Sequence, residues 1–166
     1  EGRLWWFGKN GIWASVSDAY ESFDPFAEGA SGPLNRTIGS GPVDTINWAV
    51  SLQRLMAGAE GSELSIGSSS LEEPVTPTNF NIKAASTQGS AAVEPIKIDQ
   101  QGVYVQRNGI NVFELSFDAN GYDYTSKDLT LIVPELGNPG IVRMDSQRHP
   151  DTRLHCVRSD GSVMLA

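Results

Sequence analysis

The residues best suited to metal or nucleophile chemistry lie in one short segment near the end of the chain. His149, Asp151, His155 and Cys156 are close together there, but the order HxxxxxHC matches no usual spacing of zinc ligands. In a strand, His155 and Cys156 would point to opposite faces. Since Cys156 is the lone cysteine, no internal disulfide can form. We therefore expect a loop histidine, a strand histidine and a small buried thiol rather than a metal site.

Carboxylates are abundant, but their spacing matches no defined site. Segment 118–128, DANGYDYTSKD, begins like a calcium loop at Asp118 and Asn120 and then departs from it, because Tyr122 stands at the fifth position and no glutamate closes the loop. We interpret these acids as solvated turn residues: Glu72, Glu73, Asp118, Asp123 and Asp128. A glycosidase pair is defined by carboxyl separation in the fold, so a propeller-type hydrolase stays open as an alternative.

Other motifs for catalysis or phosphate binding are absent. The chain contains no GxSxG, and its glycine-rich stretches at 39–41 and 58–61 are not followed by GK[ST]. We interpret both stretches as turns. No catalytic residue, cofactor or metal is assigned.

The charge balance argues against a protein that grips nucleic acid. The net charge is −8, from 20 acidic and 12 basic residues, whereas phosphate binding depends on clustered Lys and Arg. An acidic surface is compatible with a passage through which DNA slides without sticking. No run of residues is long and apolar enough to predict a membrane span.

Aromatic residues are concentrated near the start of the chain. They could form a carbohydrate-binding platform, but their position on and just after a predicted hairpin favours packing between sheets. They are Trp5, Trp6, Trp13, Tyr20, Phe23 and Phe26.

The element that organises the chain is a predicted hairpin over 102–117, GVYVQRNGINVFELSF. Asn108-Gly109 suits a two-residue type I′ turn, in which both central residues have positive φ. That turn would set Val105 opposite Val112, Tyr104 opposite Phe113 and Gln106 opposite Asn111. Both faces of the hairpin would then carry apolar groups, so we expect other sheets to cover both.

Three further hairpins follow the same pattern. The turns are predicted at Asn10-Gly11, Glu60-Gly61, Asn108-Gly109 and Asp160-Gly161, and their glycines lie 50, 48 and 52 residues apart. Three of the four hairpins open on Arg-Leu, at Arg3, Arg54 and Arg153. The expected cross-strand pairs are Trp5 with Val16, Leu55 with Ile66, Ala57 with Leu64, and Val157 with Met164. An interval of about 40–50 residues is the length of a four-stranded propeller blade.

Further strands and connectors complete the predicted units. Strands are expected before the last three hairpins at 43–50, 92–98 and 140–145, and after two of them at 79–84 and 129–133. Polar connectors are expected at 24–42, 67–78, 118–128 and 147–151, with one short helix within 17–26. The sequence therefore predicts an all-β fold. It would be one β-propeller region over 1–166 with about four repeats of four-stranded antiparallel blades, the first and last incomplete, cut from a longer chain.

At the level of sequence, four segments carry a resemblance to a known family. They are RLWWFG with WASVSDAYESFD (3–8 and 13–24), RLMAGAEGSELSIG (54–67), the long stretch from STQGSAAVEP to LTLIVPEL (86–136), and GIVRMDSQRHPDTRLHCVRSDGSVMLA (140–166). They resemble the β-propeller part of the tail nozzle proteins of short-tailed bacteriophages, also called tail tubular B-type or tail stabilisation proteins. Proteins of that kind are several times longer.

The resemblance implies a structural virion protein, made in the bacterial cytoplasm and assembled into the phage tail. It implies no enzyme activity. The implied partners are further copies of the chain in a ring, other tail proteins, a host surface, and DNA in transient passage during ejection. A receptor- or glycan-binding propeller is the main alternative, and it would need exposed Trp or Tyr residues clustered on one face.

Overall fold

The structure is a computed structural model that describes residues 2–9, 11–38, 45–70 and 73–165. Over these residues it is all-β, with four antiparallel sheets and one 3-10 helix, η1 (Pro134–Gly137). No helix in the described ranges is long and apolar enough to cross a bilayer.

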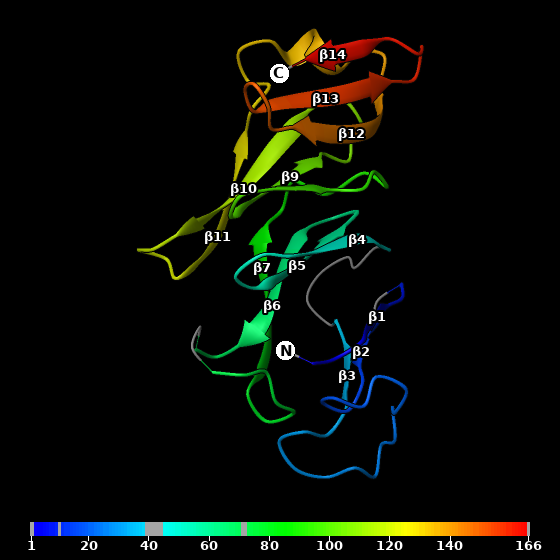
Figure 1. Ribbon diagram of the computed structural model, residues 1–166, viewed down its shortest axis with the longest axis vertical. Coiled ribbons are helices and arrows are strands. Elements are labelled where there is room, and N and C mark those ends of the chain that lie inside the picture. Colours follow the sequence, from blue (N-terminus) through cyan, green and yellow to red (C-terminus); the bar gives the residue numbers. More distant parts are fainter. Residues whose placement is uncertain (1, 10, 39–44, 71–72, 166) are drawn as a thin grey trace.

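Each sheet is a meander, in which strands that follow one another in the chain are neighbours in the sheet. The first sheet contains β1 (Trp5–Phe7), β2 (Gly11–Ala14) and β3 (Leu34–Thr37); the second contains β4 (Ile46–Ser51), β5 (Leu55–Ala59), β6 (Glu63–Ser68) and β7 (Phe80–Ser86). The third contains β8 (Ile96–Ile98), β9 (Gln101–Val105), β10 (Val112–Asp118) and β11 (Asp123–Asp128); the fourth contains β12 (Ile141–Gln147), β13 (Arg153–Arg158) and β14 (Val163–Leu165). The sheets follow the long axis of the molecule in chain order (Figure 1).

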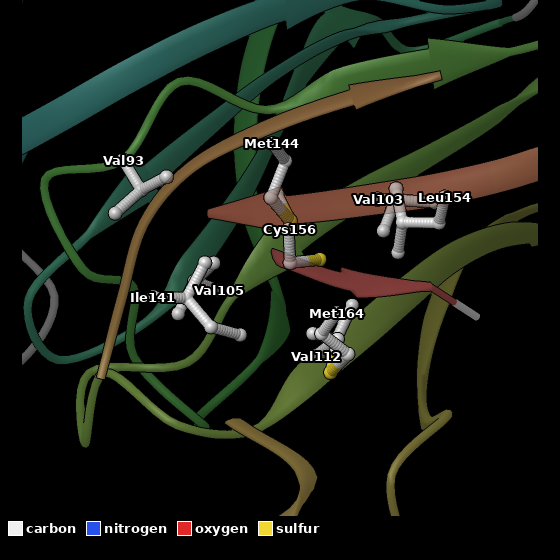
Figure 2. Packing of buried hydrophobic residues seen from close by; sticks show 9 residues of the cluster. All are labelled: Val93, Val103, Val105, Val112, Ile141, Met144, Leu154, Cys156 and Met164. Atoms are coloured by element: carbon white, nitrogen blue, oxygen red, sulfur yellow. The ribbon is translucent and has the colours of Figure 1, made fainter. Parts of the chain in front are cut away.

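Three apolar cores lie between consecutive sheets. The first joins sheets one and two and contains Ile12, Ile38, Ala57, Leu64 and Ile66. The second joins sheets two and three and contains Trp48, Met56, Tyr104, Phe113, Leu115 and Tyr124. The third joins sheets three and four and contains Val93, Val103, Val105, Val112, Ile141, Met144, Leu154, Cys156 and Met164 (Figure 2). The sheets are therefore stacked face to face, and the two middle sheets are buried on both faces.

The hairpin of β9 and β10 shows how strand alternation serves two cores at once. Val105 lies opposite Val112 and Tyr104 lies opposite Phe113, as predicted. The valine pair faces the third core, whereas the aromatic pair faces the second. The expectation that other sheets cover both faces of this hairpin is confirmed.

The turn of this hairpin is not the predicted type I′ turn. Gly109 has φ of 77°, but Asn108 is not among the residues with positive φ. The Gly109 N–H donates to the Gln106 carbonyl, and the Gln106 N–H donates to the Asn111 carbonyl at 2.9 Å. The Asn108 side chain accepts hydrogen bonds from the N–H groups of Ile110 and Asn111. The side chain thus closes a longer loop while the predicted register is kept.

The other hairpins agree with the predicted registers in part. Leu55 lies opposite Ile66 and Ala57 opposite Leu64, as the turn at Glu60-Gly61 predicts. At Asp160-Gly161 the register differs by one residue, because the Arg158 N–H bonds the Ser162 carbonyl across a three-residue loop. Met164 therefore lies opposite Cys156 rather than Val157.

In the first hairpin Trp5 lies opposite Ala14 and not Val16. The reason is that Gly8 donates its N–H to the Gly11 carbonyl, so the turn precedes Gly11, which begins β2. Asn10, the other predicted turn residue, lies outside the described residues.

Three predicted elements are wrong. β3 (Leu34–Thr37) lies inside the stretch 24–42, which was expected to be a connector, and it pairs with β2. The last strand of the third sheet is β11 at 123–128, inside the stretch expected to be a connector, and residues 129–133 do not form the expected strand. The burial of Tyr124 in the second core accounts for this strand. The apolar contacts of Tyr124 outweigh the preference of the polar residues around it for a loop. The expected helix in 17–26 is replaced by turns, with Asp18 at φ 58° and a bridge between Val16 and Ala19.

The remaining predicted strands are found with different ends. The 79–84 strand is β7, the 92–98 strand shortens to β8, and the 140–145 strand is β12. The 43–50 strand is β4, which begins at Ile46; residues 43 and 44 lie outside the described ranges.

Replacing Gly109 by Ala should destabilise the protein by about 1 kcal/mol. The added Cβ meets nothing within 4 Å, so the cost comes from the positive φ alone. Gly121→Ala is the matched control, because Gly121 is a loop glycine outside the positive-φ set and its nearest neighbour is the flexible Asp118 side chain. Equal unfolding free energies for the two variants in urea titrations would contradict the prediction.

Candidate functional site

The histidine and cysteine segment does not assemble a reactive site. Cys156 is fully buried in the third core, and burial raises the pKa of its thiol to about 11, against an opposing effect of Arg158. His155 is on the other face of β13, where its ring contacts Gln147 Oε1 at 3.0 Å. The opposite orientations and the buried thiol agree with the predictions. Among the described residues no three His, Cys, Asp or Glu side chains gather as a metal site would require.

The acids of segment 118–128 are separated by the β10–β11 hairpin. Asp118 and Asp123 lie opposite each other at its turn end, where they accept hydrogen bonds from the N–H groups of Asn120 and Tyr124. Asp128 lies at the far end of β11, paired with Phe113 in register, and accepts bonds from Thr130 and Asn111. These carboxylates therefore organise loops.

The N-terminal aromatics divide into a buried and an exposed group. Trp5 packs inward against Phe7 and Phe80, with ring centroids 6.5 and 6.0 Å away. Trp6 and Trp13 lie opposite each other in β1 and β2 and are 58% and 37% exposed. The expectation of packing holds for Trp5, whereas Trp6 and Trp13 form an aromatic surface on the outer face of the first sheet.

Two glycines give this aromatic surface its shape. A Cβ at Gly11 would lie 2.2 Å from the Trp13 ring, and one at Gly8 would lie 2.9 Å from it. The Trp13 indole therefore rests against the bare backbone of the first hairpin, and only glycine leaves room for it there. Tyr20, Phe23 and Phe26 are exposed as well, in the turns that follow β2.

The most unusual polar group is a buried carboxylate that the sequence analysis did not single out. Glu63, at the start of β6, is fully buried. Its two oxygens accept hydrogen bonds from Ser86 Oγ at 2.6 Å and Ser90 Oγ at 2.7 Å. No salt bridge of Glu63 is found; within the described ranges the one ion pair is the exposed Arg153–Asp151 pair. Two hydroxyl donors therefore take the place of a cation.

Ser86 is the last residue of β7 and lies opposite Glu63 in register, whereas Ser90 lies on the segment that connects the second sheet to the third. Ser90 donates its N–H to the Ala59 carbonyl of β5, and Ala91 donates its N–H to the Val105 carbonyl of β9. The Asn47 side chain of β4 donates to the Ser90 carbonyl at 2.8 Å. Residues 87–91, which we call the crossover, are thus bonded to both sheets, and the hydrogen bond of Ser90 to Glu63 attaches the crossover to β6 as well.

Aromatic groups close the space around Glu63. Burial, and then the negative charge of Glu63, raise the pKa of the Tyr104 phenol, which is hydrogen-bonded to Ser126 at 2.8 Å. Trp48 covers Gly58, where a Cβ would lie 2.1 Å from the indole and 2.6 Å from Ser90 Oγ. The stretch 58–61 is thus a packing and turn feature, as interpreted from sequence; the stretch 39–41 lies outside the described residues.

Comparison with known proteins gives no family assignment. No family model matches the chain, and none of the curated proteins matches it.

Glu63→Ala should destabilise the protein by about 3 kcal/mol, because it leaves the buried Ser90 hydroxyl and the half-buried Ser86 hydroxyl without their acceptor. Glu63→Gln should cost only about 1 kcal/mol, since its carbonyl oxygen still accepts from one serine and its amide can donate to the other. Chemical denaturation measures both values. The control is Glu94→Ala at an exposed position, where the change should stay within about 0.5 kcal/mol. A loss for Glu63→Ala no larger than the control would contradict this role.

Proposed function

We propose that this chain is a segment of a β-propeller and that it serves as a structural component of a phage tail of the nozzle, or tail tubular B, type. The observation that supports the propeller is that each sheet is a meander and that every consecutive pair shares an apolar core. Successive blades of a propeller pack in the same way.

The two outer faces of the stack are suited to further blades. The outer face of the first sheet carries the exposed Trp6 and Trp13. The outer face of the fourth sheet carries Val163 and Leu165, which are both more than half exposed. In this proposal additional sheets of a longer polypeptide cover both faces. The stack would then be a section of a ring rather than a complete one.

The assignment to a phage tail depends on the resemblance of segments 3–8, 13–24, 54–67, 86–136 and 140–166 to nozzle proteins. The net charge of −8 fits a conduit that does not retain DNA. An exposed apolar stretch before η1 suits contact with other copies or tail proteins, with Leu131 75% and Ile132 93% exposed. In this role the protein acts mechanically, through contacts between subunits.

The test is to locate the full-length chain in the particle. Mass spectrometry of purified virions and electron microscopy with a labelled chain should place it in the tail, in several copies around the axis. Recovery of the chain only as a free monomer in infected cells, and never in particles, would overturn the proposal.

A second candidate function, glycan binding, is favoured by the paired Trp6 and Trp13 on one face. Aromatic faces stack on sugar rings, so a glycan-binding protein should give array signals that Trp6→Ala and Trp13→Ala abolish. Tyr122→Ala, at an exposed aromatic outside that face, is the matched control. Array signals that survive both tryptophan changes would exclude this surface as the glycan site.

A further inference from the structure

Two complete Asn-Gly pairs lie within the part of the chain that the structure describes, Asn108-Gly109 and Asn120-Gly121. In such a pair the backbone nitrogen of glycine can attack the side-chain carbonyl carbon of asparagine, because glycine has no Cβ to hinder the approach. The two pairs lie in loops at opposite ends of β10. Their reacting groups have different surroundings.

The Asn108-Gly109 pair is held by hydrogen bonds on both reacting groups. The Asn108 side-chain oxygen accepts from the N–H groups of Ile110 and Asn111 at 3.0 and 3.1 Å, and its amide nitrogen donates to Asn111 Oδ1 at 3.0 Å. The Gly109 N–H donates to the Gln106 carbonyl at 2.8 Å. The attack would require several of these bonds to break together, so a reaction at this turn needs a local opening of the hairpin.

The Asn120-Gly121 pair lies in an open turn between β10 and β11. Both residues are exposed, and the neighbouring Tyr122 is 70% exposed. The backbone N–H of Asn120 donates to Asp118 Oδ1 at 3.0 Å, but within the described ranges the Asn120 side chain and the Gly121 N–H form no hydrogen bond. The carboxamide can therefore rotate towards the Gly121 nitrogen without breaking native contacts.

We propose that Asn120 is a site of spontaneous deamidation in the folded protein and that the fold protects Asn108 from the same reaction. The Gly121 nitrogen loses its proton and forms a bond to Asn120 Cγ, while the bond from Cγ to Nδ2 breaks and the side-chain nitrogen leaves as ammonia. Water then opens the succinimide ring at one of its two carbonyl carbons. The product is aspartate, or isoaspartate, in which the main chain passes through the former side chain.

Either product places a new carboxylate at the turn end of the β10–β11 hairpin, where Asp118 and Asp123 already lie opposite each other. Like charges in such close positions repel one another. Isoaspartate also lengthens the main chain within the turn that Asp118 Oδ1 closes. We therefore expect the modification to loosen this turn while Tyr124 stays buried in the second core. The proposal is independent of the phage-tail assignment.

The experiment is a timed incubation of the intact 166-residue chain in mildly alkaline buffer, followed by a glutamate-specific protease and mass spectrometry. Cleavage after Glu114 separates the peptide with Asn108 from the peptide with Asn120, and the mass gain from amide to carboxylic acid reports each conversion. Asn120 should convert at least about tenfold faster than Asn108, because Asn108 reacts only from a locally opened state. In guanidinium chloride, where the chain is unfolded, the two sites should convert at similar rates.

Gly121→Ala should slow the conversion of Asn120 several-fold, because the added methyl group hinders the attacking nitrogen. Gly121 lies outside the positive-φ set, so the variant should fold normally. Gly109→Ala is the matched control and should leave the rate at Asn120 unchanged. Equal rates at the two sites in the folded protein, an Asn120 that stays intact while the unfolded chain converts, or a rate at Asn120 that Gly121→Ala does not change would overturn the proposal. The same difference between the sites in the unfolded chain would also overturn it, since the protection would then not come from the fold.

Discussion

The hydrogen bonds of the Glu63 carboxylate with Ser86 and Ser90 are the interaction on which the middle of the structure depends. A buried carboxylate without a cation is tolerated only where its oxygens are well satisfied. Here one donor, Ser86, is the last residue of β7 and pairs with Glu63 in register, and the other, Ser90, comes from the crossover between the second and third sheets. Moving the crossover would remove one of the two donors to this charge, so the relative position of the two sheets is fixed by a polar contact as well as by the apolar core beside it.

The second constraint is that the middle sheets must present apolar groups on both faces. A strand presents apolar groups to both sides when its alternating side chains are apolar on both faces. In β9, for example, Tyr104 faces the second core, whereas Val103 and Val105 face the third. Close approach also requires small residues under large ones, and Gly58 beneath Trp48 is the clearest case. The cores therefore differ in character, since the second is rich in aromatic residues and the third in aliphatic ones.

Much of this arrangement is predictable from sequence because it is local. The Asn108-Gly109 hairpin has its predicted register, although side-chain bonding by Asn108 changes the turn type. The strand β11 was not predicted because most of its residues are polar. Its position in the sheet depends on the burial of one residue, Tyr124, in the second core. The Glu63 site depends on segments from different strands meeting in space, and no spacing rule encodes such a meeting. The sole sequence clue to Glu63 was an acid in an otherwise small and apolar strand, ELSIGS.

The most direct test of the central claim is residue-specific amide hydrogen exchange at the crossover. The Ser90 and Ala91 N–H groups lie outside the named strands, yet they donate to Ala59 in β5 and Val105 in β9. If the crossover locks the second and third sheets together, both amides should exchange as slowly as the central amides of β5 and β9. Exchange as fast as that of exposed loop amides such as those of Asn120 and Gly121 would show that the crossover is not held by Glu63 and would contradict the account.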